Sequence, residues 1–154
     1  MLINLIHVQR LGLLDSLSGY EFIVPPEVEA EVRVPTQARA LELAFKSGHI
    51  KRQSLATTNE LQLYANYARV LGMGEAACLA MAEVNGLYVA SDERRKFLKL
   101  CEEKLGTGRL VNTPGIYVLA IRAHLLTVQQ ADSDKAVLEK RRFKMRFSSF
   151  AEVV

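Results

Sequence analysis

Apolar and polar residues follow one another along this chain in short runs that predict helices alternating with brief strands. At the start of the chain Leu2, Leu5 and Leu14 recur at helical spacing, which predicts a helical segment over residues 1–17. Four apolar runs bounded by glycine, proline or polar residues predict buried strands, at residues 22–24, 50–55, 87–90 and 110–111. Helical patterns fill the remaining segments, at residues 26–34, 37–46, 57–71, 75–84, 91–106, 113–121 and 132–142.

Local signals support several of these boundaries. Thr57 followed by Glu60 is a capping-box pattern that opens a helix, and Pro26 suits the first turn of another. Gly86 is expected to end a helix just before a strand. Helices that alternate with short apolar strands are typical of a parallel sheet covered on both faces. The sequence therefore predicts an α/β fold, a three-layer α/β/α sandwich, in a single domain over residues 1–154.

The composition narrows the class of protein. Apolar residues make up 49% of the 154 residues, which is enough to build one full core without disulfides. No run of about 18 apolar residues occurs, so we expect no membrane span, and the N-terminus lacks the features of a secretory signal. Cys78 and Cys101 lack the spacing of a zinc site. We expect both to be buried free thiols of a protein in a reducing compartment, the cytoplasm.

Three acidic residues stand where a ligand is expected. Ligands of open parallel sheets gather beyond the carboxyl ends of the strands, and Asp92 directly follows the predicted strand at 87–90. Glu75 opens a helix that is apolar almost all round and should be buried. Glu31 lies shortly beyond the strand at 22–24. Each has a simpler interpretation: a helix cap for Asp92, a favourable helix dipole for Glu75, and a solvated acidic face for Glu31.

Taken together, the three acids predict a cation site. Carboxylates about 5 Å apart repel by roughly 3 kcal/mol at an effective dielectric constant of about 20, unless a cation or a shared proton offsets the repulsion. Because no histidine or cysteine accompanies them at ligand spacing, the oxygen ligands favour Mg²⁺ or Mn²⁺ over zinc. Such a metal activates water and neutralises charge on a phosphodiester. The acids therefore indicate phosphate chemistry.

Basic residues fit a nucleic-acid substrate, although the net charge of +3 is too small to establish one. Arg94 and Arg95 come directly after Asp92. Near the C-terminus the cations Arg142, Lys144 and Arg146 alternate with Phe143, Met145 and Phe147. This period of two predicts an exposed strand with its apolar side inward. The cations either guard a sheet edge against aggregation or bind backbone phosphates.

Three motifs resemble the PIN-domain superfamily. They are the run Leu71-Gly72-Met73-Gly74-Glu75-Ala76-Ala77, the run Val89-Ala90-Ser91-Asp92-Glu93-Arg94-Arg95, and the run Asn112-Thr113-Pro114-Gly115-Ile116-Tyr117-Val118-Leu119-Ala120. The chain is most similar to short stand-alone prokaryotic members that carry a Gly-x-Gly-Glu-Ala motif. The likeness extends over nearly the whole chain and includes residues 2–14 and the helix that carries Glu31.

The resemblance implies an α/β/α sandwich and a Mg²⁺- or Mn²⁺-dependent ribonuclease. Many members of the superfamily are toxins of toxin–antitoxin pairs, and members often form homodimers, so RNA, an antitoxin protein and a second copy are the implied partners. The family's helix glutamate corresponds to Glu31, its central acid to Glu75 and its strand-end aspartate to Asp92. Thr113 corresponds to a small polar position that often hydrogen-bonds near the metal.

The chain departs from the family pattern at its start. In the family, a first aspartate ends the first, central strand a few residues before the segment that matches Met1-Leu2-Ile3, and no counterpart of either precedes Met1 here. Relative to the family, the sequence therefore reads as truncated at its N-terminus, with the first central strand short or missing. Two expectations remain open. Either residues upstream restore the metal site, or the protein is a catalytically impaired PIN-like module that binds RNA or a partner protein.

Overall fold

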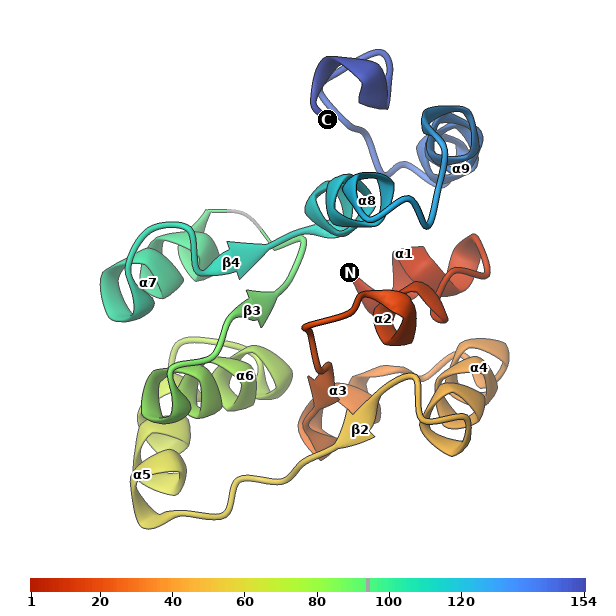
Figure 1. Ribbon diagram of the computed structural model, residues 1–154. Coiled ribbons are helices and arrows are strands. Elements are labelled where there is room, and N and C mark those ends of the chain that lie inside the picture. The colour runs from red at the N-terminus through yellow and green to blue at the C-terminus, as the bar shows by residue number, and fades with distance from the viewer. Residues whose placement is uncertain (94) are drawn as a thin grey trace.

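The computed structural model describes residues 1–93 and 95–154. Short parallel strands lie among helices, as the alternating pattern predicted (Figure 1). In chain order the elements are α1 (Leu2–His7), α2 (Leu13–Ser16), β1 (Ile23–Val24), α3 (Pro26–Glu31), α4 (Pro35–Lys46), β2 (Lys51–Arg52), α5 (Thr58–Tyr67), α6 (Met73–Asn85), β3 (Val89–Ala90), α7 (Lys96–Leu105), β4 (Leu110–Val111), α8 (Thr113–Arg122), α9 (Val128–Lys140) and a final 3-10 turn (Phe150–Glu152).

The strands form two separate parallel pairs. β1 pairs with β2, with Ile23 opposite Lys51, and β3 pairs with β4, with Val89 opposite Leu110. Within residues 1–93 and 95–154 no strand joins the two pairs. The N-terminus lies in the space between them, next to α1 and α2 (Figure 1). The predicted α/β class with parallel strands is thus confirmed, and each strand is only two residues long.

The predicted capping box forms and fixes the start of α5. The Glu60 amide donates to Thr57 Oγ1 at 3.2 Å, while Glu60 Oε2 accepts the Thr57 amide at 2.8 Å. Asn85 of α6 donates to Glu60 Oε1 at 2.7 Å, which joins α5 to α6. Hydrogen bonds from the Thr57 and Ala56 amides, and then from Asn85, lower the pKa of Glu60 to about 2. An ionised, fully partnered carboxylate can therefore remain buried there.

Several boundaries differ from the pattern for local reasons. The predicted helix over residues 1–17 is split into α1 and α2, and Gln9 between them adopts a left-handed φ of 57°. α5 ends at Tyr67 rather than at residue 71, and α6 begins at Met73, two residues before the predicted start. Gly86 ends α6 in the left-handed region, as expected, with φ of 64°.

Two apolar clusters fill the interior. The larger joins α1, α2, α4, α8 and α9, and its fully buried members include Leu5, Leu41 and Tyr117. The smaller joins α5, α6 and α7 beside β3, around Leu79 and Phe97. Cys78 and Cys101 are free thiols, and Cys101 is buried in the smaller cluster. None of the described helices is long and apolar enough to cross a membrane.

The C-terminal segment corrects one sequence prediction. Residues 141–149 form turns and bends rather than the predicted strand. The alternation itself is present: Phe143, Met145 and Phe147 pack on the larger cluster, while Arg142, Lys144 and Arg146 are exposed. Helix α9 holds this segment in place, because Asp132 accepts the amide of Phe150 at 2.8 Å. Packing on the core, rather than pairing with a strand, therefore produces the period of two.

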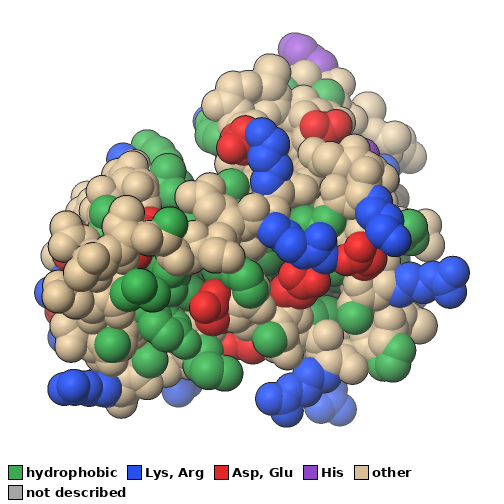
Figure 2. All heavy atoms as spheres, turned by 90° about the horizontal axis from the view of Figure 1, so that it is seen from below, with side chains coloured by type: hydrophobic (Ala, Val, Ile, Leu, Met, Phe, Trp, Pro, Cys, Tyr) green, Lys and Arg blue, Asp and Glu red, His purple; other side chains and the backbone are tan. Residues whose placement is uncertain are grey.

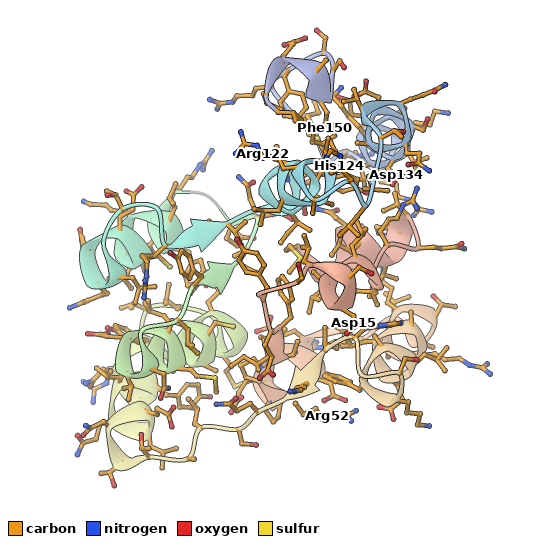
Figure 3. The ribbon with its side chains drawn as sticks, in the orientation of Figure 1. Asp15, Arg52, Arg122, His124, Asp134 and Phe150 are labelled. Atoms are coloured by element: carbon orange, nitrogen blue, oxygen red, sulfur yellow. The ribbon has the colours of Figure 1, made fainter. Side chains whose placement is uncertain are left out.

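Helix α9 is tied to the rest of the molecule by a second acid. Asp134 Oδ2 accepts from Arg10 Nε at 2.7 Å and from the Tyr117 hydroxyl at 3.0 Å. Asp134 belongs to α9 and Phe150 to the final 3-10 turn (Figure 3). The Tyr117 and Phe150 rings stack with centroids 5.3 Å apart. These contacts anchor residues 128–152 against α8 and the loop between α1 and α2.

Candidate metal centre

The N-terminus of α6 receives a carboxylate from α3. The Gly74 amide donates to Oε1 of Glu31 at 2.8 Å, although the two residues are 43 positions apart. α3 ends beside the first turn of α6, which places Glu31 there (Figure 1). Backbone amides at a helix N-terminus attract negative charge, so this end of α6 is a favourable place for an acidic side chain.

Glu75 places a second carboxylate at the same helix end. Its Oε2 accepts the Gly72 amide at 3.2 Å. A methyl group on the Cα of Gly72 would lie 3.7 Å from Oε1 of Glu31 and 3.8 Å from Oε2 of Glu75, so the two acids flank one point. As predicted, the helix that Glu75 opens is buried, with Ala76, Leu79 and Ala80 fully covered. The first turn of α6 therefore carries two carboxylates over a buried helix.

Two groups at this helix end, Glu75 and Cys78, have raised pKa values. The pKa of Glu75 lies above its ordinary value, because of burial first and then the charges of Glu93 and Glu31. The Gly72 amide and the Lys96 ammonium oppose that shift. Burial, followed by Glu31 and other neighbours, also raises the pKa of the Cys78 thiol to about 12. A cation at this point would relieve the repulsion and favour ionised Glu75.

Asp92, the third predicted acid, has partners of a different kind. Its Oδ1 accepts the Thr113 amide at 2.7 Å, and its Oδ2 accepts the Thr113 hydroxyl at 2.6 Å and the Asn4 amide group at 2.8 Å. The Met1 ammonium lies 2.9 Å from the same Oδ2. Asp92 follows β3 and Thr113 follows β4, so the parallel pairing of these strands brings the two residues together. Two of the residues that the family resemblance selected are therefore in direct contact.

The surroundings of Asp92 hold it in the ionised form. Burial alone would raise its pKa, but the Met1 ammonium and the hydrogen bonds from Thr113 outweigh burial, so the pKa lies below its ordinary value. Thr113 is fully buried, and its hydroxyl also accepts a 3.3 Å hydrogen bond from Asn4. Asp92 thus serves as an acceptor that joins the β3–β4 pair to α1.

The structure brings two of the three predicted acids together and places the third in a separate set of contacts. Within the part of the chain that the structure describes, no group of three or more His, Cys, Asp and Glu side chains is close enough to hold a metal ion. Two carboxylates nevertheless fit Mg²⁺, which is commonly bound through one or two carboxylates, waters and substrate phosphates. The donor set at α6, two carboxylates with no imidazole, suits a hard cation rather than zinc.

Glu29 and Glu31 of the acidic helix α3 have different partners, and Glu31 is exposed. Glu29 forms a two-point ion pair with Arg52, with both distances 2.9 Å, and Arg52 also contacts Glu42. Acidic and basic side chains lie side by side on the face seen from below (Figure 2), and Arg52 lies on that side of the molecule (Figure 3). Glu31 instead turns to the Gly74 amide. The two glutamates therefore differ in role although they share one helix.

The predicted nucleic-acid residues have mixed positions. Arg94 lies outside the described residues, and Arg95 is exposed with a left-handed φ of 66°. Arg142, Lys144 and Arg146 are exposed, and no ion pair involves them among residues 1–93 and 95–154. Lys96 is one basic residue that the sequence did not single out for the site. Its ammonium donates to the Val70 carbonyl at 2.7 Å and lowers the pKa of Glu75.

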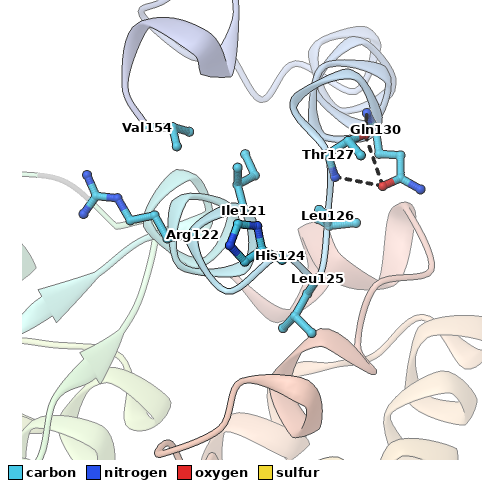
Figure 4. A pocket seen from close by; sticks show the side chains of 8 residues that line it. All are labelled: Ile121, Arg122, His124, Leu125, Leu126, Thr127, Gln130 and Val154. Carbon is cyan, nitrogen blue, oxygen red and sulfur yellow. Dashed lines mark hydrogen bonds between the residues drawn. The ribbon is translucent and has the colours of Figure 1, made fainter.

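A pocket of about 470 Å³ at the C-terminal end of α8 lies apart from these acids (Figure 4). Its lining residues are Ile121, Arg122, His124, Leu125, Leu126, Thr127, Gln130 and Val154. None of them is acidic, and none belongs to the predicted site. The volume of a pocket therefore does not identify the metal centre, and the acids at α6 remain the candidate.

Comparison with known proteins identifies the family of this chain. A family model described as DUF3368, a PIN domain, matches residues 1–107. Comparisons with curated proteins and with solved structures found no match. The matched region covers more than half of the chain and contains Glu31, Gly74, Glu75 and Asp92, whereas Thr113 and the basic C-terminal segment follow it. The chain belongs to the PIN-domain family.

Proposed function

We propose that this protein is a divalent-metal-dependent ribonuclease. Glu31 and Glu75 would hold Mg²⁺ or Mn²⁺ at the first turn of α6. Asp92, kept ionised by the Met1 ammonium and by Thr113, would support this centre from the β3–β4 side. The site residues are then Glu31, Glu75, Asp92 and Thr113. When bound, the metal would lower the pKa of a water molecule and neutralise charge on the phosphodiester.

The observation that carries this proposal is the pair of carboxylates that flank one point above Gly72. Two acids so placed raise the free energy of the ionised state, and the charges of Glu93 and Glu31 add to burial in raising the pKa of Glu75. The folded protein keeps these two carboxylates together despite their repulsion, and its family is known for phosphodiester cleavage. A divalent cation bound between the two carboxylates would offset their mutual repulsion, because both would be attracted to the ion.

Cleavage of a structured RNA in the presence and absence of Mg²⁺ or Mn²⁺ tests the activity. We expect Glu75→Gln to reduce the rate by about 100-fold or more, since even outer partners of metal ligands are worth roughly 10–100-fold. The matched control is Glu103→Gln, an exposed glutamate on α7 whose nearest ion-pair distance is 3.9 Å. Equal rates for the wild type and Glu75→Gln, or cleavage that persists in a chelator, would contradict the proposal.

The residues that we propose to bind RNA are Arg94 and the exposed cations Arg95, Arg142, Lys144 and Arg146. Replacing Arg142, Lys144 and Arg146 together with glutamine should reduce the slope of log affinity against log salt by about 2, because each phosphate contact on a single strand contributes about 0.7. Lys46 and Lys51 are paired with acids, so their double replacement serves as the control. A slope unchanged by the triple variant would remove this segment from the RNA interface.

A second candidate is a PIN-like module that binds RNA or a partner protein without cutting. The contacts of Asp92 favour it, because the Met1 ammonium, Asn4 and Thr113 already occupy both of its oxygens. Calorimetry with Mn²⁺ separates the two functions. Binding that Glu75→Gln removes supports the nuclease, whereas RNA binding without metal binding supports the module.

The biological setting that we propose is a toxin–antitoxin pair in the cytoplasm, with the protein as a homodimeric toxin. Growth arrest on expression, relieved by Glu75→Gln and by a small protein encoded next to this one, is the expected result. Growth unaffected by the wild-type protein would contradict the toxin role. Analytical ultracentrifugation measures the oligomeric state directly.

A further inference from the structure

The second glycine of the Gly-x-Gly-Glu motif lies directly beneath the carboxylate of Glu31. Gly74 is buried in the first turn of α6, and its amide donates to Oε1 of Glu31 at 2.8 Å. A Cβ atom at Gly74 would lie 2.9 Å from Oε2, 3.0 Å from Cδ and 3.0 Å from Oε1 of that glutamate. Carbon atoms do not approach a carboxylate that closely, so any side chain at this position displaces Glu31.

Backbone conformation does not explain a glycine at this position. Gly74 is absent from the glycines with positive φ, which are Gly19, Gly48, Gly86, Gly106 and Gly108. In a right-handed helical conformation alanine is favoured over glycine by up to about 1 kcal/mol. The structural reason for glycine at position 74 is therefore the space that the Glu31 carboxylate occupies.

We infer that Gly74 is a positioning residue for the metal centre, through the seat that it provides for Glu31. The seat consists of the open Cα and the amide of Gly74. It fixes Oε1 of Glu31, while no hydrogen bond to Oε2 occurs among the described residues. The inference rests on the proposed function, because the seat matters when Glu31 serves as a metal ligand. Outer partners that orient a ligand typically contribute 10–100-fold to metal affinity.

Gly12 provides a control glycine away from the acids. A methyl group on its Cα would have His49 as its neighbour, at 3.8 and 3.9 Å, which is ordinary van der Waals contact. Gly12 also has a negative φ of −62°, so alanine fits its backbone. Gly72 does not serve as a control, because a methyl group there would occupy the point between Glu31 and Glu75.

Calorimetric titration with Mn²⁺ tests the inference on the full-length protein. We expect Gly74→Ala to weaken binding by about 10–100-fold and Gly12→Ala to change it by less than about 3-fold. Urea unfolding without metal should show Gly74→Ala to be about as stable as the wild type. The reason is that the Glu31 carboxylate stands at the end of a flexible side chain and can move aside. Equal Mn²⁺ affinity for Gly74→Ala and the wild type would overturn the inference.

A double-mutant cycle separates positioning from a general structural effect. In a Glu31→Ala background, Gly74→Ala should have no further effect on Mn²⁺ affinity, because the carboxylate that it displaces is gone. Full additivity of the two substitutions would also overturn the inference.

A metal-free measurement keeps the inference testable if the proposed function fails. If the wild type binds no Mn²⁺, the proposed function fails, and the seat is then tested by the amide proton shift of Gly74. That chemical shift should change in the Glu31→Ala variant and remain the same in the Glu103→Gln variant. No movement in Glu31→Ala would contradict the seat.

Discussion

Two acidic regions of this protein use the same functional group in opposite ways. At the first turn of α6, Glu31 and Glu75 lie near each other and each accepts one backbone amide. At the end of β3, Asp92 is surrounded by a hydroxyl, two kinds of amide and an ammonium. The pKa of Glu75 is raised, and the pKa of Asp92 is lowered.

The difference shows how partners, rather than burial, decide what a carboxylate does. Burial raises the pKa of both groups and is the largest single influence on each. Donors reverse it at Asp92, whereas neighbouring acids add to it at Glu75. Asp92 therefore stabilises the folded chain by itself, while the α6 pair is suited to gain stability from a cation. Three measurements sharpen or break this contrast.

The largest expected effect is the stabilisation of the α6 pair by metal. At a Mn²⁺ concentration about 100 times the dissociation constant, the wild type should gain about 2.7 kcal/mol in the free energy of unfolding. Glu75→Gln should gain little, and without metal it should be no less stable than the wild type, since it removes a repulsion. Urea unfolding with and without Mn²⁺ measures both. A metal-free Glu75→Gln that is clearly destabilised would remove the contrast with Asp92.

The opposite behaviour is expected at Asp92. Asp92→Asn should lower the free energy of unfolding by about 2 kcal/mol with or without metal, because hydrogen bonds to a charged acceptor are lost and an amide group faces donors. Asp15→Asn is the control. Asp15 is 59% exposed and lies 3.5 Å from His49, so its replacement should matter by less than about 0.5 kcal/mol (Figure 3). Similar stability for both variants would show that Asp92 is not a structural acceptor.

The smallest expected effect is the pH dependence without metal, and its sign differs between the two regions. A raised pKa makes the contribution of Glu75 complete below its ordinary value of 4.5, and that contribution is lost as pH rises through the folded-state pKa. A lowered pKa makes the contribution of Asp92 complete above 3.8, and that contribution is lost as pH falls through the folded-state pKa. Glu75→Gln should remove only the first loss, and Asp92→Asn only the second. Stability profiles between pH 2 and 7 that both variants leave unchanged would contradict the assignment.

The local parts of the fold could be predicted because they depend on neighbouring residues. The capping box of Thr57 and Glu60 and the left-handed end of α6 at Gly86 both form as the sequence indicates. The strand expected around residues 141–147 does not form, although its buried and exposed positions do alternate. A period of two indicates which side chains face the core, but it does not supply a neighbouring strand to pair with.

The candidate site residues could be named from the sequence, but their grouping could not. Strand ends and the apolar helix singled out Glu31, Glu75 and Asp92, and the family resemblance added Thr113. The effect of Lys96 on the pKa of Glu75 could not be inferred from positions along the chain. It also could not assign Glu29 to Arg52 and Glu31 to Gly74, because these contacts join segments far apart in the chain.

By itself the sequence determined the α/β class, the capping box of α5, the end of α6 at Gly86 and the PIN-domain family, because each follows from periodicity, short-range hydrogen bonding or a motif read along the chain. Only the tertiary structure decided that Glu31 lies against Gly74 and that Asp92 is bound to Thr113 and Asn4. The physical reason is that a carboxylate's pKa depends on charges and donors within a few ångströms, and the packing of α3, α6 and the strand pairs brings those groups together.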